Sequence, residues 1–163
     1  MTTYSAEELS SFLKLKPHPE GGAYSESYRS PGAFGGNGPF PAGRPYSTAI
    51  YFLLKKGERS ALHMIKSDEI WHFYMGGPLN IAEINPAGEL TVTVLGADLG
   101  AGQKLQHAVR AGVWFGAWPA DGTGYSLAGC TVAPGFDFAD FRFADKAEML
   151  RLYPNHAEVI NKL

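Results

Sequence analysis

The chain has 163 residues and a formal net charge of −2, and its 14 Lys and Arg residues are dispersed along the sequence. The sequence therefore has no basic patch for nucleic acid or an anionic membrane, and no apolar run approaches the roughly 20 residues that span a bilayer. The first ten residues lack the apolar stretch of a signal peptide, so we expect a cytoplasmic protein with one domain over residues 1–163.

A short helix is expected near the N-terminus, because Ser5 and Glu8 have the spacing of a capping box and an apolar stripe follows before Pro17. Beyond it, a strand is indicated where larger side chains alternate with small ones, at Tyr24, Glu26 and Tyr28.

Residues 29–45 are rich in Gly and Pro, which predicts a long flexible loop without regular structure. Such a loop can close over a binding site as a lid, or it can be surface without that role. The sequence leaves both interpretations open.

From residue 46 onward, strand patterns recur at roughly the 8–12 residue spacing of an all-β sandwich or barrel. A short helix is expected to follow over residues 145–153. In the last strand the aromatic residues change phase, which predicts a bulge near Ala139 and Asp140. Cys130 has no second cysteine to pair with and is expected to be a buried small side chain. The expected strands cover residues 46–54, 61–65, 69–75, 79–84, 90–95, 104–110, 113–117, 125–132 and 136–143.

One segment between Gly57 and Gly76 has the spacing of a ligand site, with His63 and Glu69 on two successive strands. This order resembles the first motif of the cupin superfamily, in which a His-x-His strand and a Glu strand bring three ligands to one metal inside a β-barrel. Ile65 stands where that motif has its second histidine.

Further segments resemble the small cupin group called cupin type five. The resemblance implies an all-β fold, a double-stranded β-helix of the jelly-roll type with short N- and C-terminal helices. It also implies a homodimer that holds a small-molecule ligand in its barrel, in a family whose members mostly have no assigned reaction. The segments are HPEGG at 18–22, STAIYFLL at 47–54, SDEIWHF at 67–73, AGVWF at 111–115 and VAPGFDFADF at 132–141.

The second cupin motif would place its metal-binding histidine at the position of Phe115. Only His63 and Glu69 then remain of four usual ligands, and two mixed ligands seldom hold a first-row metal. We therefore expect no metal and no other cofactor. His72 should point away from the interior, because Glu69, Trp71, Phe73 and Met75 share the opposite face of the strand unless a bulge intervenes.

His63 and Glu69 are expected to face each other within hydrogen-bonding reach, as an acid/base dyad. Arg59 is expected to anchor a phosphate or carboxylate of the ligand. The remaining histidines, His18, His107 and His156, have no carboxylate at ligand spacing, and each is expected to be a solvated or capping side chain. Glu20 and Glu26 are expected at the surface, although either can enter the pocket. Apolar and aromatic walls, with His72 as a further ligand-binding candidate, are predicted at Tyr51, Ile65, Trp71, His72, Phe73 and Phe115.

The pattern favours metal-independent acid/base chemistry, of the epimerase or isomerase type, on a sugar-like or carbonyl-bearing metabolite. In this respect it resembles the metal-free deoxysugar epimerases among the cupins. Two alternatives stay open. One is a non-catalytic cupin that binds a small metabolite, in which the dyad is only a satisfied polar contact. The other is a metal-dependent enzyme that uses His63, Glu69 and a rotated His72.

Overall fold

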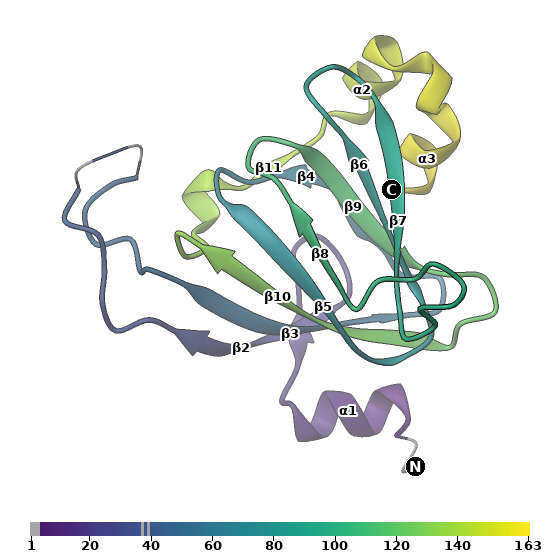
Figure 1. Cartoon of the computed structure of the whole chain (residues 1–163), viewed down its shortest axis with the longest axis horizontal. Coiled ribbons are helices and arrows are strands. Elements are labelled where there is room, and N and C mark those ends of the chain that lie inside the picture. The colour runs from purple at the N-terminus through teal and green to yellow at the C-terminus, as the bar shows by residue number, and fades with distance from the viewer. Residues whose placement is uncertain (1–3, 37, 39) are drawn as a thin grey trace.

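A computed structural model describes residues 4–36, 38 and 40–163, and it consists mainly of two antiparallel sheets (Figure 1). The predicted all-β class is confirmed. The six-stranded sheet has the order β1 (Lys16–Pro17), β2 (Ala23–Arg29), β3 (Thr48–Lys55), β10 (Tyr125–Ala133), β5 (Asp68–Gly76) and β8 (Gln106–Val109). The five-stranded sheet has the order β11 (Arg142–Phe143), β4 (Ser60–Met64), β9 (Trp114–Pro119), β6 (Leu79–Ile84) and β7 (Leu90–Leu95).

The main hydrophobic core lies between the sheets, because each strand turns alternate side chains inward. Phe52 of β3, Trp71 of β5 and Phe115 of β9 are all buried there, with Trp71 edge-on to both phenylalanines. Burying one such side chain contributes about 1.5–3 kcal/mol, so these residues are a large part of what holds the sheets together.

Helices cover the outer faces of both sheets. α1 (Ala6–Phe12) packs through Leu9 against Leu53 and Leu127 of the six-stranded sheet. On the five-stranded sheet, α2 (Lys146–Leu152) and α3 (Ala157–Lys162) bury Met149 and Ile160 (Figure 1). Two 3₁₀ turns, η1 (Phe138–Asp140) and η2 (Pro154–His156), complete the set. None of the helices in the described part of the chain is long and apolar enough to cross a bilayer.

Most elements agree with the sequence prediction. The capping box of α1 is confirmed, because Glu8 N donates to Ser5 Oγ at 3.2 Å and Ser5 N donates to Glu8 Oε2 at 2.8 Å. The predicted strand over 136–143 is wrong. Asp137 instead caps η1 through the N–H of Ala139, and only Arg142–Phe143 pairs with β4. The aromatic change of phase therefore came from a helical turn, which a period-two interpretation mistakes for a bulge.

A bulge does occur in β5, where the pairing with β10 shifts between Phe73 and Met75. The shift turns Met75 to the outer face, where it lies near Tyr51 and Tyr74. The expectation that Met75 points inward with Glu69 is therefore wrong, because a bulge reverses the alternation beyond it.

The loop predicted over 29–45 begins at the end of β2, and its residues 37 and 39 lie outside the described residues. Its two arms meet in a bridge between Ala33 and Pro45. Arg44 is buried and forms an ion pair with Asp140 of η1, and it donates to the carbonyl of Gly135 at 3.3 Å. The loop is thus tied to the segment that follows β10. Its action as a lid stays a prediction.

We expect Arg44→Met to lower the free energy of unfolding by about 2–4 kcal/mol, because it leaves the buried Asp140 carboxylate with Lys66 as its remaining cation, at 3.3 Å. Urea denaturation followed by tryptophan fluorescence measures the change. Arg110→Met is the matched control, because the Arg110–Asp68 pair has side chains 76% and 41% exposed and its loss should cost no more than about 1 kcal/mol. Equal losses in the two variants would contradict a structural role of the buried pair.

Candidate functional site

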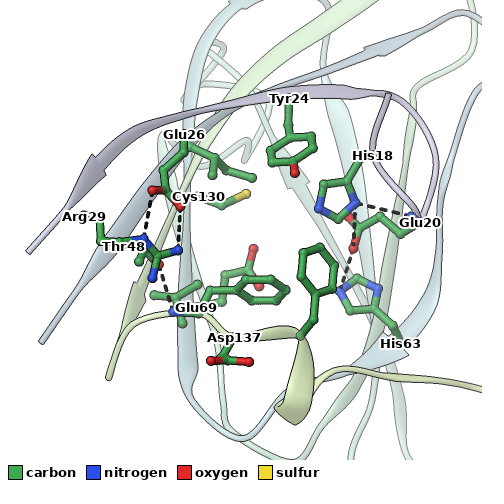
Figure 2. Close-up of a pocket in the computed structure, with 14 residues that line it drawn as sticks. His18, Glu20, Tyr24, Glu26, Arg29, Thr48, His63, Glu69, Cys130 and Asp137 are labelled. Atoms are coloured by element: carbon green, nitrogen blue, oxygen red, sulfur yellow. Dashed lines mark hydrogen bonds and ion pairs between the residues drawn. The ribbon is translucent and has the colours of Figure 1, made fainter. Parts of the chain in front are cut away.

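A cavity of about 250 Å³ opens between β2, β3, β10 and the segment around η1, and it reaches down to β4 and β5 (Figure 2). Its lining combines titratable groups with aromatic rings. The lining residues are His18, Glu20, Tyr24, Glu26, Arg29, Thr48, Ile50, His63, Glu69, Cys130, Val132, Phe136, Asp137 and Phe138.

Glu20 reaches the buried end of this cavity because the chain reverses immediately after it. Gly21 and Gly22 have φ angles of 113° and 68°, which favour glycine. A Cβ on Gly21 would lie 2.0 Å from the carbonyl oxygen of Arg59, so the turn also needs glycine for its close approach to the start of β4. The N–H of Ala61 then donates to the carbonyl of Glu20 at 2.8 Å, which fixes Glu20 beside β4.

The carboxyl group of Glu20 contacts the imidazole of His63. His63 Nε2 lies 3.3 Å from Glu20 Oε2, and the two side chains are only 3% and 9% exposed. His63 Nδ1 lies 2.7 Å from the carbonyl oxygen of Ala61. A carbonyl oxygen only accepts, so Nδ1 carries the proton of the neutral ring and Nε2 is the free acceptor that faces Glu20.

This geometry places one proton between Glu20 and His63. Burial raises the pKa of Glu20 to about 7, against smaller lowering effects of His18 and of the hydrogen bond from Ser60. Burial lowers the pKa of His63 to about 4, with the Ala61 carbonyl acting in the opposite direction. At neutral pH and below, the proton is therefore held mainly by Glu20, which donates it toward Nε2 of His63.

Ser60 also holds the Glu20 carboxyl in place, and His18 lies beside it. Ser60 Oγ donates to Glu20 Oε1 at 2.8 Å, and His18 Nδ1 lies 3.7 Å from Oε2. The backbone N–H of Glu20 donates to His18 Nδ1 at 3.3 Å, so the neutral ring of His18 carries its proton on Nε2. Burial lowers the pKa of His18, which keeps this second ring neutral as well.

Glu69 supplies a second protonated carboxyl group to the same cavity. Burial and the nearby charge of Glu20 raise its pKa to about 8, and a hydrogen bond with Cys130 lowers it to a smaller extent. The same burial, together with the charge of Glu69, raises the pKa of the Cys130 thiol well above its usual range, so this cysteine is a poor nucleophile. The cavity thus holds a neutral imidazole and two carboxyl groups that give up their protons only near pH 7–8.

The other end of the cavity is open and carries an ion pair. Arg29 Nε donates to Glu26 Oε1 at 2.9 Å and Arg29 Nη2 donates to Oε2 at 2.7 Å, and the two side chains are 46% and 41% exposed. Residues three apart on a regular strand point to opposite faces. A bulge between Glu26 and Tyr28 shifts the register against β3 and brings Arg29 to the cavity side (Figure 2).

The side chains at the usual metal-binding positions of cupins do not fit a metal. Ile65 and Phe115 are apolar and buried, and both ring nitrogens of His63 already have partners. Within the described ranges, no group of three or more His, Cys, Asp or Glu side chains is arranged to hold a metal ion.

Some predicted site residues are where the sequence analysis expects them, and others are not. His63 and Glu69 both line the cavity, but the carboxyl group in contact with His63 is that of Glu20. The expected contact between His63 and Glu69 is wrong because the turn at Gly21 and Gly22 brings a closer carboxylate across β4. Glu20 and Glu26, expected at the surface, both line the cavity.

Arg59 does not anchor a ligand in this cavity. Its Nε donates to the main-chain oxygen of Leu163 at 3.0 Å, and it lines a separate depression beside Trp118 and Lys162. A register shift between Ser60 and His63 turns the side chains of both residues toward the interior. Arg59, which precedes Ser60, therefore points to the outer face of β4.

His72 points away from the cavity, as the strand alternation predicts. Its Nε2 lies 3.0 Å from Thr131 Oγ1 and its Nδ1 lies 3.0 Å from Gln106 Nε2. Its predicted contribution to ligand binding is therefore wrong. The solvated positions predicted for His18 and His107 are also wrong, because His18 lines the cavity and His107 pairs with Glu83 across the two sheets.

The predicted apolar walls lie in the core instead of the cavity. Ile65, Trp71, Phe73 and Phe115 pack between the sheets, and Tyr51 lies on the outer face against Tyr74. The cavity instead opens toward β2, so Tyr24, Phe136 and Phe138 form its aromatic walls. For Tyr24 and Glu26 the sequence did hold a signal, because the alternation along the strand places both side chains on one face.

We expect the free energy of unfolding to fall as the pH rises from about 6.5 to 8. Glu20 and Glu69 have folded-state pKa values of about 7 and 8 against 4.5 in the unfolded chain, so the unfolded state binds fewer protons in this window. Each such group lowers the free energy of unfolding by roughly 1.4 kcal/mol per pH unit between its unfolded pKa of 4.5 and its folded pKa. His63, with its folded pKa lowered to about 4, contributes stability that is lost only below its unfolded value of 6.5.

Denaturant unfolding at several pH values tests this. Glu69→Gln should show a shallower decline that levels off above pH 7, whereas the exposed Glu158→Gln should keep the wild-type slope. A wild-type profile that is flat or rising between pH 6.5 and 8 would contradict the raised pKa values.

Two solved structures are similar to this chain over nearly its whole length. A protein from Shewanella oneidensis is 43% identical, with 99% of this chain and 98% of that chain covered and a TM-score of 0.90. A hypothetical protein from Leishmania major is 37% identical, with 98% of each chain covered and a TM-score of 0.89.

A cupin 2 domain-containing protein from Halorhodospira halophila shares the fold, with 14% identity, a TM-score of 0.57, and 88% of this chain and 85% of that chain covered. These structures support the predicted jelly-roll barrel. No curated protein matches the sequence. Residues 7–144 match the family Cupin_5, described as Cupin superfamily (DUF985), which confirms the resemblance found in the motifs. The chain therefore belongs to the Cupin_5 family of the cupin superfamily.

Proposed function

We propose that this cupin catalyses proton transfer next to a carbonyl group of a small metabolite, as an epimerase or isomerase does. The observation that carries the proposal is the 3.3 Å contact between Glu20 Oε2 and His63 Nε2 at the buried end of a ligand-sized cavity. An acid/base catalyst works best when its pKa lies near the working pH, and Glu20 and Glu69 have pKa values of about 7 and 8.

The two carboxyl groups divide the roles. When the Glu20–His63 pair has lost its proton, it accepts a proton from the carbon beside the carbonyl, and the electron pair of that C–H bond moves to the carbonyl oxygen. Glu69 keeps its proton to a higher pH and donates it, or a hydrogen bond, to the enolate oxygen. The pair then returns its proton to the other face of the same carbon, which gives an epimer, or to the neighbouring carbon, which gives an isomer. Glu69 takes back a proton from the oxygen at which the carbonyl re-forms, so the enzyme ends in its starting state.

A binding protein without turnover is the second candidate. The observation in its favour is that the polar atoms of His63 already have partners within the protein, since Nδ1 contacts the Ala61 carbonyl and Nε2 contacts Glu20. In that case the pair contributes fixed polarity to the cavity, and the ligand leaves unchanged.

Hydrogen exchange separates the two candidates. The protein is incubated in D₂O with a panel of ketoses, dehydro sugars and 2-oxo acids, and the loss of α-hydrogen signals is measured by proton NMR. We expect it to replace α-hydrogens with deuterium in at least one member of the panel. Glu20→Gln and His63→Gln should each slow this exchange by about 10²–10⁴-fold, because each removes a member of the base pair. Melting temperatures monitor folding. Full exchange by either folded variant, or no exchange across the panel, would refute the catalytic role.

The pH dependence of the exchange rate should be bell-shaped. The rate should rise through about pH 7, as the Glu20–His63 pair loses its proton, and fall through about pH 8, as Glu69 does. Glu69→Gln, which cannot ionise, should abolish the alkaline decline and leave the acidic limb in place. An alkaline decline that persists in this variant would assign that limb to another group.

A further inference from the structure

We infer that the cavity selects an uncharged, hydroxyl-rich ring about the size of one monosaccharide and discriminates against the anionic forms of such molecules. The inference rests on the proposed function for the position of the reacting end, and it goes further by naming the class of substrate.

The first argument is the state of the cation in the cavity. Arg29 is the only Lys or Arg among the described residues that line it, and Nε and Nη2 of its guanidinium both donate to Glu26. Glu26 takes two of the five N–H groups of Arg29, so a phosphate or carboxylate can reach only the remaining three and must lie beside the Glu26 carboxylate. The hydrogen bonds from Arg29 also lower the pKa of Glu26, so this competitor stays ionised.

The second argument is the balance of charge around Arg29. Glu26 and Asp137 both line the open end of the cavity, and both carboxylates lie close enough to raise the pKa of Arg29. Lys16 lies over the ring of Tyr24 at 5.1 Å and near Glu26, but it does not line the cavity. At the buried end, Glu20 and Glu69 hold their protons to about pH 7–8 and offer an anion no cation. An anion entering the open end therefore meets two carboxylates, Glu26 and Asp137, against the single guanidinium of Arg29.

The third argument is the match between the walls and a sugar ring. Tyr24, Phe136 and Phe138 offer aromatic faces, with Phe136 and Phe138 edge-to-face at 4.9 Å. Aromatic faces suit the C–H faces of a sugar, while polar groups at both ends suit its hydroxyl groups. Cavities for drug-sized ligands begin at about 300 Å³, so a cavity of about 250 Å³ has room for one sugar ring.

Matched probes test the inference. Binding of D-glucose, D-fructose and D-tagatose is compared with binding of D-glucuronate and D-glucose 6-phosphate by isothermal titration calorimetry at pH 7. We expect at least one neutral sugar to bind the wild type with a Kd at least tenfold lower than both anions. Saturable binding of an anion that is equal or tighter, or no saturable binding of any neutral sugar, would overturn the inference.

Glu26→Gln should strengthen the binding of the anions at least tenfold, because it removes the carboxylate that competes with them for Arg29. The exposed pair contributes little to stability, so this variant should fold. Asp68→Asn is the matched control, because it removes one negative charge from an exposed pair outside the cavity and should leave all affinities unchanged. An unchanged anion affinity in Glu26→Gln would show that Glu26 does not compete with anions for Arg29, which contradicts the first argument.

The proposed function and this inference can fail separately. Deuterium exchange into an anionic substrate, with no neutral sugar bound, would refute the inference and leave the proposed function intact. The opposite outcome is saturable binding of a neutral sugar with no deuterium exchange into that sugar or into any member of the panel. It would leave the inference intact and refute the proposed function.

Discussion

The site depends on a carboxyl group that the fold takes out of water and gives neutral partners. Glu20 lies between the imidazoles of His63 and His18 and the hydroxyl of Ser60, with no Lys or Arg side chain in contact with it among the described residues. A buried carboxylate without a cation is costly, so the group keeps its proton to near-neutral pH. The neutral His63, the raised pKa of Glu69 and the acid/base potential of the cavity all follow from this arrangement.

The strands that carry the site place apolar side chains where a cupin metal site has histidines. In the resembling cupin motif, histidines at the positions of Ile65 and Phe115 would join His63 and Glu69. Here Ile65 and Phe115 extend the core between the sheets, and Phe115 packs against the ring of His63 at 4.1 Å. Phe141 stacks on His63 at 4.9 Å. The imidazole is held between aromatic rings, and its orientation is set by packing as well as by the Ala61 carbonyl.

The fold could be predicted from the sequence because strand alternation, turn residues and the capping box are local signals. The strands at 79–84 and 90–95 and the cap at Ser5 all agree with the structure. Predictions failed where a register shift reverses which face a residue occupies, as at Met75 and Arg59. A shift of one residue is invisible in composition. The pairing of Glu20 with His63 was also out of reach, because it joins residues 43 positions apart through a loop whose path depends on Gly21 packing against Arg59.

The ion pair between Arg44 and Asp140 links two parts of the chain that the sequence presents as unrelated. Arg44 belongs to the Gly- and Pro-rich loop between β2 and β3, and Asp140 ends the 3₁₀ turn whose other residues include Phe138, a wall of the cavity. An outward movement of this loop would break the buried ion pair between Arg44 and Asp140, unless the segment that carries Phe138 moved with it. The position of the loop and the shape of the aromatic wall are thereby coupled through one ion pair, so substitutions far from Glu20 and His63 can alter the form of the cavity.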